Sequence, residues 1–304
     1  MISLTQEFTD RIHRTFGEAG ALWLKSLPLL LDHYAERWSL TLGRPFTGLS
    51  YNYVTRARLA DGTLAVLKLG VPNPELTAEI AALRHFEGVG TVKLIQADPD
   101  AGALLLESVQ PGTPLLELND DERATATAAK LIGQLHKPLS DRGPFPTVRD
   151  WGRGFERLRA RFNGLTGPFP VELVEKAEHD LVELTNTQGE AVLLHADLHH
   201  WNILSSERAA WLAIDPKGLI GEPEYEAGAW LRNPIPFIFE QPDLRTTILR
   251  RVDQFVDLLT FDRLRVLRWG FYEAVLSAWW SFEASDPEWA RMLTIAQVIA
   301  SISH

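Results

Sequence analysis

The stretch LLHADLHHWNIL, residues 193–204, places polar side chains between apolar flanks. Three histidines, an aspartate and an asparagine lie between the apolar runs 192–194 and 203–204. The flanks are typical of buried strands, whereas burying the polar residues between them would carry a free-energy penalty. We therefore expect a strand, a functional loop and a second strand. Two kinds of chemistry fit these residue types, a metal site and phosphoryl transfer.

A metal site would use His195, His199, His200 and Asp197, since imidazole and carboxylate groups are the zinc ligands open to a chain without cysteine. The metalloprotease pattern H-E-x-x-H requires a glutamate after the first histidine, and Ala196 occupies that position here. The apolar flanks also favour a loop between strands over a helix that would align two histidines on one face. A histidine-based metalloenzyme therefore stays an alternative.

Phosphoryl transfer explains more of the loop. It requires a carboxylate that orients and deprotonates the attacking hydroxyl, and hard oxygen ligands for magnesium. The protein-kinase catalytic loop H-R-D-L-x-x-x-N supplies both, and residues 195–202 read H-A-D-L-H-H-W-N. We predict that Asp197 is the catalytic base and Asn202 a metal ligand. Asp215, which ends the apolar run of WLAIDPKG, is predicted to be the second metal ligand.

The elements that must position these residues divide the chain into a sheet-rich part and a helical part. The sheet-rich part is expected to contain helices at 4–16 and 20–38, strands joined at Asp61-Gly62, a helix from Asn73-Pro74 to about 88, and strands near 91–96 and 103–109. After a break at PGTP, residues 111–114, helices are expected at 119–136 (capped by Asn119), about 150–162, 171–187, 243–259, 263–283 and 287–300. We infer an α+β fold with a small N-terminal lobe, 1–109, and a larger C-terminal lobe, 110–304.

Composition narrows the functional classes. The 304 residues include 30 basic and 40 acidic side chains, and the net charge of −10 argues against binding to nucleic acids or anionic membranes. The same charge would suit a cationic ligand. The absence of cysteine excludes disulfides and thiolate sites. The N-terminus has charges throughout, and the best apolar run, 21–31, is too short to span a membrane. We expect a soluble cytoplasmic protein.

The sequence HADLHHWN followed by AIDPKGLIGEPEYEAGAWLRNP resembles the aminoglycoside phosphotransferase family, in particular its streptomycin 6-phosphotransferase and hydroxyurea kinase branch. The resemblance spans about residues 40–300 and is most specific between 192 and 234. It implies a two-lobed protein-kinase-like fold and transfer of the ATP γ-phosphate, with Mg²⁺, to a hydroxyl of a small molecule. Streptomycin-type aminoglycosides are the expected acceptors, which implies an antibiotic resistance kinase.

Two questions stay open after this resemblance. Kinases for hydroxyurea or another small metabolite, and a nucleotide-binding pseudokinase, remain alternatives to the aminoglycoside kinase. In addition, Glu226 stands where members of the family usually carry the aspartate that braces the catalytic loop. Whether the longer side chain makes the same bracing contact is a question for the structure.

Lys68 and Glu79 are predicted to form the ion pair that positions ATP phosphates in kinases. Lys68 continues the apolar row of Leu64 and Val66 on one strand face. Glu79 lies within the apolar stripe of the helix that begins at Pro74. An acid in such a stripe needs a partner, and Lys68 supplies one. The alternative for Lys68 is a strand-end lysine with its ammonium group in water.

The remaining nucleotide contacts are predicted from position more than from residue type. The segment GRPFTGLS, 43–50, lacks the lysine of a Walker A loop. A phosphate loop at 47–52 would instead use Gly48 and Ser50 to present backbone donors. Glu107 and Val109, in ALLLESVQPGTP, are expected to lie where the main chain meets adenine. Each of these segments also fits an ordinary turn or connector.

The acceptor site is predicted from acids and aromatics that follow the metal aspartate. Glu222 and Glu224 would bind guanidinium or ammonium groups, and Trp230 would stack on a cationic ring. Acids further along the chain, among them Glu273, could serve in the same way. Each of these residues also fits a solvated helix face or a core position.

Overall fold

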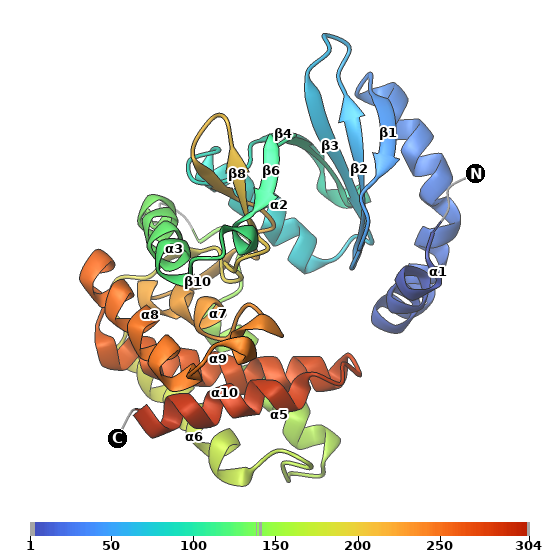
Figure 1. The fold of residues 1–304 in the computed structure, drawn as a ribbon. Helices are drawn as coiled ribbons and strands as arrows, with labels where there is room; N and C mark the ends of the chain where they lie inside the picture. Colours follow the sequence, from blue (N-terminus) through green and yellow to red (C-terminus); the bar gives the residue numbers. More distant parts are fainter. Residues whose placement is uncertain (1–3, 138, 140–141, 303–304) are drawn as a thin grey trace. The chain divides into compact units, whose positions relative to one another are not determined.

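The structure, a computed structural model, describes residues 4–137, 139 and 142–302. The chain forms two compact units (Figure 1). The first contains the chain up to Gly88 and Val92–Gln110, and the second contains Val89–Thr91 and the chain from Pro111 onward. The predicted boundary between the two lobes lay between residues 109 and 110. In the structure the boundary lies between residues 110 and 111, and residues 89–91 also belong to the second unit.

The first unit is built on a five-stranded antiparallel sheet in the order β1-β2-β3-β5-β4. Its strands are β1 Thr41–Pro45, β2 Asn52–Arg58, β3 Leu64–Gly70, β4 Leu94–Asp98 and β5 Ala103–Glu107. The predicted turn joins β2 and β3: the Asp61 side chain accepts the Thr63 N–H at 2.8 Å. Gly62 has a φ of +90°, which glycine adopts without steric penalty. This turn fixes the register in which Lys68 pairs with Val54 of β2; on its other side Lys68 pairs with Leu104 of β5.

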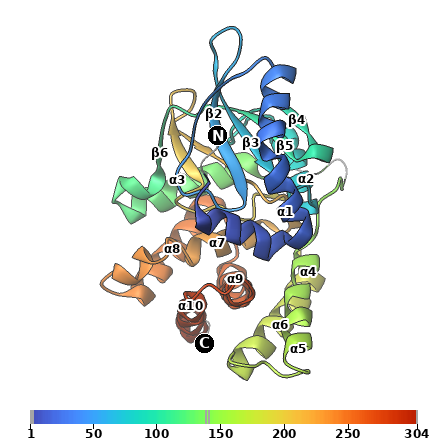
Figure 2. The same ribbon diagram turned by 90° about the vertical axis from the view of Figure 1, so that its right-hand side faces the viewer.

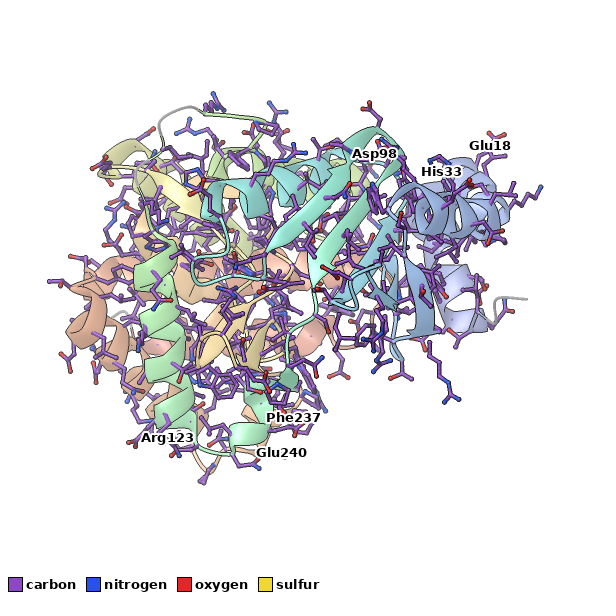
Figure 3. All side chains as sticks on the ribbon, turned by 90° about the horizontal axis from the view of Figure 1, so that it is seen from above. Glu18, His33, Asp98, Arg123, Phe237 and Glu240 are labelled. Atoms are coloured by element: carbon purple, nitrogen blue, oxygen red, sulfur yellow. The ribbon has the colours of Figure 1, made fainter. Side chains whose placement is uncertain are left out.

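Helix α1, Gln6–Arg37, shares a hydrophobic core with this sheet. The core includes Phe8, Ile12, Trp23, Leu27 and Leu31 from the helix and Leu67, Leu69, Ala103 and Leu105 from the sheet. The helix bends at Gly17 (φ 55°, ψ −129°), and Figure 2 shows its two arms at an angle. The predicted helices at 4–16 and 20–38 are these two arms. Tyr34 Oη donates to Asp98 at 3.0 Å and so ties α1 to β4, on which Figure 3 labels Asp98.

Helix α2, Pro74–Phe86, begins as predicted. Asn73 is its N-cap, and the Asn73 side chain accepts the Leu76 N–H at 3.1 Å. The helix ends at Glu87, which has a left-handed backbone (φ 52°). Glu79 is buried on the same helix as the apolar side chains of Leu76 and Ile80, so the helix carries one acid into the interior of this unit.

The second unit is mainly helical. Its helices are α3 Asp121–Leu135, α4 Val148–Trp151, α5 Arg153–Arg161, α6 Val171–Thr187, α7 Ala227–Leu231, α8 Leu244–Leu259, α9 Arg263–Glu283 and α10 Trp289–Ile302. Helix α9 is the centre of the core, because its residues from Val266 to Trp279 include only one, Arg268, that is not buried. Helices α10, α7 and α6 pack against it. The bounds of α6 and α9 match the predicted ranges.

Two small antiparallel sheets carry the loops between these helices. One has the order β6-β8-β9 and the other pairs β10 with β7. The strands are β6 Pro111–Pro114, β7 Val192–Leu194, β8 Ile203–Ser206, β9 Trp211–Ala213 and β10 Leu219–Gly221. The PGTP segment, predicted to be a break, is therefore strand β6. Strand β9 also holds residues 89–91: Ala213 N–H donates to the Gly90 carbonyl at 2.8 Å, and Thr91 pairs with Ala213 in parallel.

One predicted cap is wrong by one residue. Asn119 has a left-handed backbone (φ 52°) and ends the short 3₁₀ helix Leu115–Leu118. Asp120 is the N-cap of α3 instead, and its carboxylate accepts the Arg123 N–H at 3.0 Å. Aspartate and asparagine cap equally well, so only the backbone conformation distinguishes them. The α+β class is confirmed. Among the described residues, none of the helices combines the length with the hydropathy that a bilayer-spanning segment requires.

Candidate active site

The loop between β7 and β8 carries the predicted base, and a buried carboxylate braces it. Glu226 Oε2 accepts the His195 N–H at 2.7 Å, and Oε1 accepts the Ala196 N–H at 2.8 Å. Ala196 has a φ of +63°, a conformation that is strained for a residue with a Cβ. The two bonds offset that strain. The glutamate therefore makes the bracing contact that the family assigns to an aspartate.

His195 ties the catalytic loop to the segment that bears Asp215. Its Nε2 lies 2.8 Å from the Ile214 carbonyl, and its Nδ1 accepts the Asp197 N–H at 3.3 Å. Because a carbonyl can only accept, the ring has its proton on Nε2. Burial lowers the pKa of His195, against the opposing charges of Glu226 and Asp197, and this keeps the ring neutral. The imidazole is thus a structural link and not an acid or base.

Two backbone hydrogen bonds strengthen the same link. Lys217 N–H donates to the His195 carbonyl at 2.8 Å, and Ile214 N–H donates to the Asn202 carbonyl at 2.9 Å. Asp215 lies between these bonds with a φ of +58°, which aspartate tolerates better than most residues. The structure therefore joins the two motifs whose spacing suggested phosphoryl transfer.

Asn202 has a fixed amide orientation. Its Nδ2 donates to the Asp197 carbonyl at 3.0 Å and lies 3.4 Å from His199 Nε2. Because the NH₂ group donates to this carbonyl, the amide oxygen is left to accept or to bind a cation. An amide oxygen and the Asp215 carboxylate are the hard ligands that magnesium prefers, so these two residues fit the predicted metal site.

Asp197 is partly buried, with 23% of its side chain exposed. Oδ1 lies 3.6 Å from His199 Nε2 and 3.4 Å from Arg232 Nη2. Burial favours the protonated acid, but the neighbouring His199, Lys217 and Arg232 outweigh it and lower the pKa of Asp197. Burial also lowers the pKa of His199, so that contact joins a neutral ring to a carboxylate. Asp197 is thus ionised at neutral pH and can accept the hydrogen bond of a hydroxyl group.

The three histidines do not converge on a common point. His195 uses both ring nitrogens within the protein, as described above. His200 is buried and stacks on Trp230 with ring centroids 3.8 Å apart. Across residues 4–137, 139 and 142–302, no group of three or more histidine, aspartate or glutamate side chains is placed to hold a metal. The geometry therefore gives no support to a histidine-based metalloenzyme.

In the first unit, Lys68 and Glu79 form the expected ion pair. Lys68 Nζ lies 2.6 Å from one Glu79 carboxylate oxygen and 2.8 Å from the other. Lys68 is 3% exposed and Glu79 7%. This excludes the alternative of a strand-end lysine with its ammonium group in water. A buried pair of this kind places a cationic group at a fixed position on the sheet.

The other predicted nucleotide residues are less strongly defined. Gly48 and Ser50 are exposed in the loop between β1 and β2, where Gly48 has a φ of +71°. Glu107 and Val109 are half-buried at the end of β5. The Glu107 N–H already donates to the Lys93 carbonyl at 3.0 Å, so this amide has a partner within the unit. Of the two, Val109 is the better candidate for a main-chain contact with adenine.

The predicted acceptor residues have structural roles. Glu222 is 2% exposed, and its carboxylate accepts from Arg265 Nε at 2.8 Å and from Trp269 Nε1. Glu224 accepts the Asp262 N–H at 3.3 Å. Trp230 is fully buried, and its Nε1 donates to Thr125 Oγ1 at 3.1 Å. Burial argues against acceptor contacts by Glu222 and Trp230, because neither side chain reaches the surface of the second unit.

Three residues near the loop escaped the sequence analysis. Trp201, within the catalytic loop, is 43% exposed, and Phe237 is 40% exposed. Their ring centroids lie 6.4 Å apart, and Phe237 begins the short 3₁₀ helix Phe237–Glu240, where both end residues are labelled in Figure 3. Arg232, next to Asp197, is the third. The sequence shows that residues 201 and 237 are aromatic, but it does not show that their side chains are exposed, because exposure depends on the tertiary structure.

Comparisons with known proteins identify related phosphotransferases. Residues 37–285 match the family model described as aminoglycoside/hydroxyurea antibiotic resistance kinase. A streptomycin 6-kinase from Streptomyces glaucescens is 31% identical over 303 residues, 98% of this chain and 97% of that protein. A hydroxyurea phosphotransferase from Kitasatospora aureofaciens is 32% identical over 307 residues, 98% of this chain and 86% of that protein. A solved aminoglycoside phosphotransferase in complex with ADP and hygromycin B aligns with a TM-score of 0.61 and 12% identity, covering 90% of this chain and 98% of that one.

Proposed function

Because this chain belongs to the aminoglycoside/hydroxyurea antibiotic resistance kinase family, we propose that it transfers the γ-phosphate of ATP to a hydroxyl of a streptomycin-type aminoglycoside. The observation that carries the proposal is the joined pair of motifs in the second unit. Asp197, Asn202 and Asp215 occur in kinase order, and the His195 ring and two backbone bonds hold their segments together.

In the proposed reaction, the acceptor hydroxyl donates a hydrogen bond to the ionised Asp197. The hydroxyl oxygen forms a bond to the γ-phosphorus, the bond from that phosphorus to the β–γ bridging oxygen breaks, and ADP leaves. The hydroxyl proton passes to the Asp197 carboxylate. A positioned base of this kind contributes about 10²–10⁴-fold in rate.

Asn202 and Asp215 would hold Mg²⁺ through an amide oxygen and a carboxylate. When bound, Mg²⁺ supplies positive charge to the phosphate oxygens. The role of Asn202 rests on its fixed amide, whose NH₂ group is bonded to the Asp197 carbonyl. The role of Asp215 rests on its backbone, held in place by the bonds on either side of it.

The first unit would bind the nucleotide. Lys68, held by Glu79, would contact phosphate oxygens, and Gly48 and Ser50 would offer backbone N–H groups. Val109 would meet adenine through its main chain. The solved aminoglycoside phosphotransferase with the same fold was crystallised with ADP, which supports a nucleotide as donor.

The acceptor is proposed to lie against Trp201 and Phe237. These two exposed aromatic rings lie close together, and an aromatic face attracts a guanidinium or ammonium group. The net charge of −10 favours a cationic acceptor. The hydroxyurea phosphotransferase, which is similar over 98% of this chain, makes hydroxyurea the second candidate.

The test is ADP release from purified protein with Mg-ATP and a panel of acceptors: streptomycin, a second aminoglycoside, hydroxyurea and simple alcohols. We expect streptomycin to stimulate ADP release and the Asp197→Asn protein to lose it while ATP affinity, measured by calorimetry, stays within about twofold. Stimulation by hydroxyurea alone would transfer the proposal to the second candidate. Binding of Mg-ATP without turnover on any acceptor would instead indicate a pseudokinase.

A sensitive bacterial host provides an independent readout. Expression of the wild-type protein should raise streptomycin tolerance, and expression of Asp197→Asn to the same level should not. Equal tolerance of both strains would contradict phosphorylation as the cause.

A further inference from the structure

Arg232 bridges the catalytic aspartate and a second, deeply buried carboxylate. It follows helix α7, and its side chain is 14% exposed. Nε lies 3.1 Å from Glu273 Oε2, and Nη2 lies 3.4 Å from Asp197 Oδ1. The two contacts use different nitrogens of one planar group, so the position of Glu273 helps to fix the direction in which the guanidinium faces Asp197.

Glu273 is itself held at a close approach of two helices. It lies on α9, is 1% exposed, and passes beside Gly228 of α7. A Cβ at residue 228 would lie 2.6 Å from Glu273 Cγ, which is too close for a side-chain contact, and 3.0 Å from its Cβ, which is close to that limit. Gly228 therefore provides the space that lets Glu273 reach Arg232.

Arg232 is charged, and it divides its contacts between Asp197 and Glu273. Burial disfavours the charged guanidinium, but Glu273 and Asp197 outweigh burial and raise the pKa of Arg232. The cation therefore persists at every working pH. Because Glu273 neutralises part of the Arg232 charge, Asp197 faces only the remainder of that charge, and Arg232 lies farther from Asp197 than from Glu273.

The contacts to Asp197 also distinguish its two oxygens. Arg232 Nη2 and His199 Nε2 both approach Oδ1. Among the residues that the structure describes, no side chain donates a hydrogen bond to Oδ2, and Oδ1 is the oxygen that both ion pairs contact most closely. One oxygen is thus held by the protein, and the other is available to a hydroxyl.

We propose that Arg232 is a positioning residue for the catalytic base: anchored by Glu273, it holds Oδ1 of Asp197 so that Oδ2 receives the proton of the acceptor hydroxyl. This inference rests on the proposed phosphotransfer. Arg232 transfers no proton in this role, and Glu273 does not contact the acceptor. Instead, Glu273 binds a guanidinium group of the protein itself.

The test is a double-mutant cycle between Arg232 and Asp197. Arg232→Gln should lower kcat by about 10- to 100-fold, since misplacing a reacting group by about 1 Å costs about 100-fold. The KM for ATP should change less than about twofold. In an Asp197→Asn background the same substitution should lower kcat by less than about twofold, because residues that act as a unit are not additive.

Two further variants separate positioning from charge. Arg232→Lys keeps the charge but cannot contact both carboxylates as a planar fork, so it should not restore turnover. Gly228→Ala keeps every charged group and displaces Glu273, so it should lower kcat in the wild-type background and have little effect beside Asp197→Asn.

Arg265→Gln is the matched control. Arg265 also pairs with a buried carboxylate, Glu222, and it has no contact with Asp197. Both arginine variants should lose thermal stability, but only Arg232→Gln should lose kcat per folded molecule. Equal loss of kcat from Arg232→Gln in both backgrounds, or no loss in either, would overturn the inference.

The cycle does not depend on streptomycin. It is measured on whichever acceptor of the panel the wild-type protein phosphorylates, and also on slow ATP hydrolysis without acceptor, where water is the nucleophile. Failure of streptomycin with success of another acceptor rejects only the proposed acceptor. Absence of both activities in the wild-type protein rejects the phosphotransfer and this inference together.

Discussion

Replacing Glu226 with alanine would remove the two bonds that hold the start of the catalytic loop. The His195 and Ala196 N–H groups donate to the Glu226 carboxylate at 2.7 and 2.8 Å, and Glu226 is 1% exposed. A hydrogen bond to a charged group contributes about 1.5–3 kcal/mol. Two such bonds give about 3–6 kcal/mol, a large part of the 5–15 kcal/mol that stabilises a typical domain.

Hydrogen exchange of the peptide that spans residues 193–198 measures this loss locally. A loss of 3 kcal/mol should raise the exchange rate of the His195 and Ala196 amides by about 150-fold. Turnover should fall as well, because Asp197 directly follows the released amides. Glu226→Gln keeps one acceptor oxygen but turns an NH₂ group toward the other amide, so we expect an intermediate result.

Glu222→Gln serves as the control, because Glu222 is also a buried carboxylate but bonds to Arg265 and Trp269. It should lower global stability and leave the exchange at His195 and Ala196 unchanged relative to the rest of the second unit. If Glu226→Ala leaves exchange and turnover at wild-type values, the bracing role is refuted.

Three other perturbations test separate parts of the site. Lys68→Met leaves the Glu79 carboxylate buried without this partner and should destabilise the protein by about 3–5 kcal/mol. The double variant with Glu79→Leu should recover most of the free energy of unfolding, measured in urea, but should not recover ATP binding. Trp201→Ala should raise the KM for a cationic acceptor by about 2- to 30-fold, from a cation–π contribution of about 0.5–2 kcal/mol, and an unchanged KM would remove Trp201 and Phe237 from the acceptor surface. Burial lowers the pKa of His200 from 6.5 to about 3. The contribution of His200 to the free energy of unfolding is therefore complete above pH 6.5 and is lost, by up to about 5 kcal/mol, as the pH drops toward 3. If the urea midpoint of His200→Gln fell with pH as much as that of the wild-type protein, this role of His200 would be wrong.

Local signals in the sequence were sufficient to predict one ion pair, between Lys68 and Glu79. Lys68 and Glu79 were predicted as a pair because each was a charge in an apolar pattern, and such a charge requires a partner inside the same unit. The spacing from Asp197 to Asn202 was informative for a similar reason, since one short loop must hold both. These predictions depend on contacts that a short stretch of chain determines.

The errors arose where the partner comes from a distant part of the chain. In the sequence, Glu222 cannot be distinguished from an acid that binds the acceptor. In the structure Glu222 is buried and pairs with Arg265, 43 residues later in the chain. The sequence also allowed Trp230 to be an exposed ring that stacks on the acceptor. In the structure His200 stacks on this ring and Thr125 accepts a hydrogen bond from its Nε1. Arg232 follows a helix as many solvated arginines do, and only the packing of α7 on α9 brings it to Asp197 and Glu273.

The placement of residues 89–91 has a consequence for dividing the gene. The peptide chain passes from one unit to the other three times, after residues 88, 91 and 110, although the units are largely consecutive in sequence. A fragment ending at Gln110 would include residues 89–91, which bind to the rest of the chain. The Gly90 carbonyl accepts a hydrogen bond from the Ala213 N–H, and the Thr91 carbonyl accepts one from Arg208, each at 2.8 Å. After a break between Gln110 and Pro111, residues 89–91 of the first polypeptide would still have hydrogen-bond partners in the second, which makes this junction the one to test as a split point for a fragment-complementation reporter.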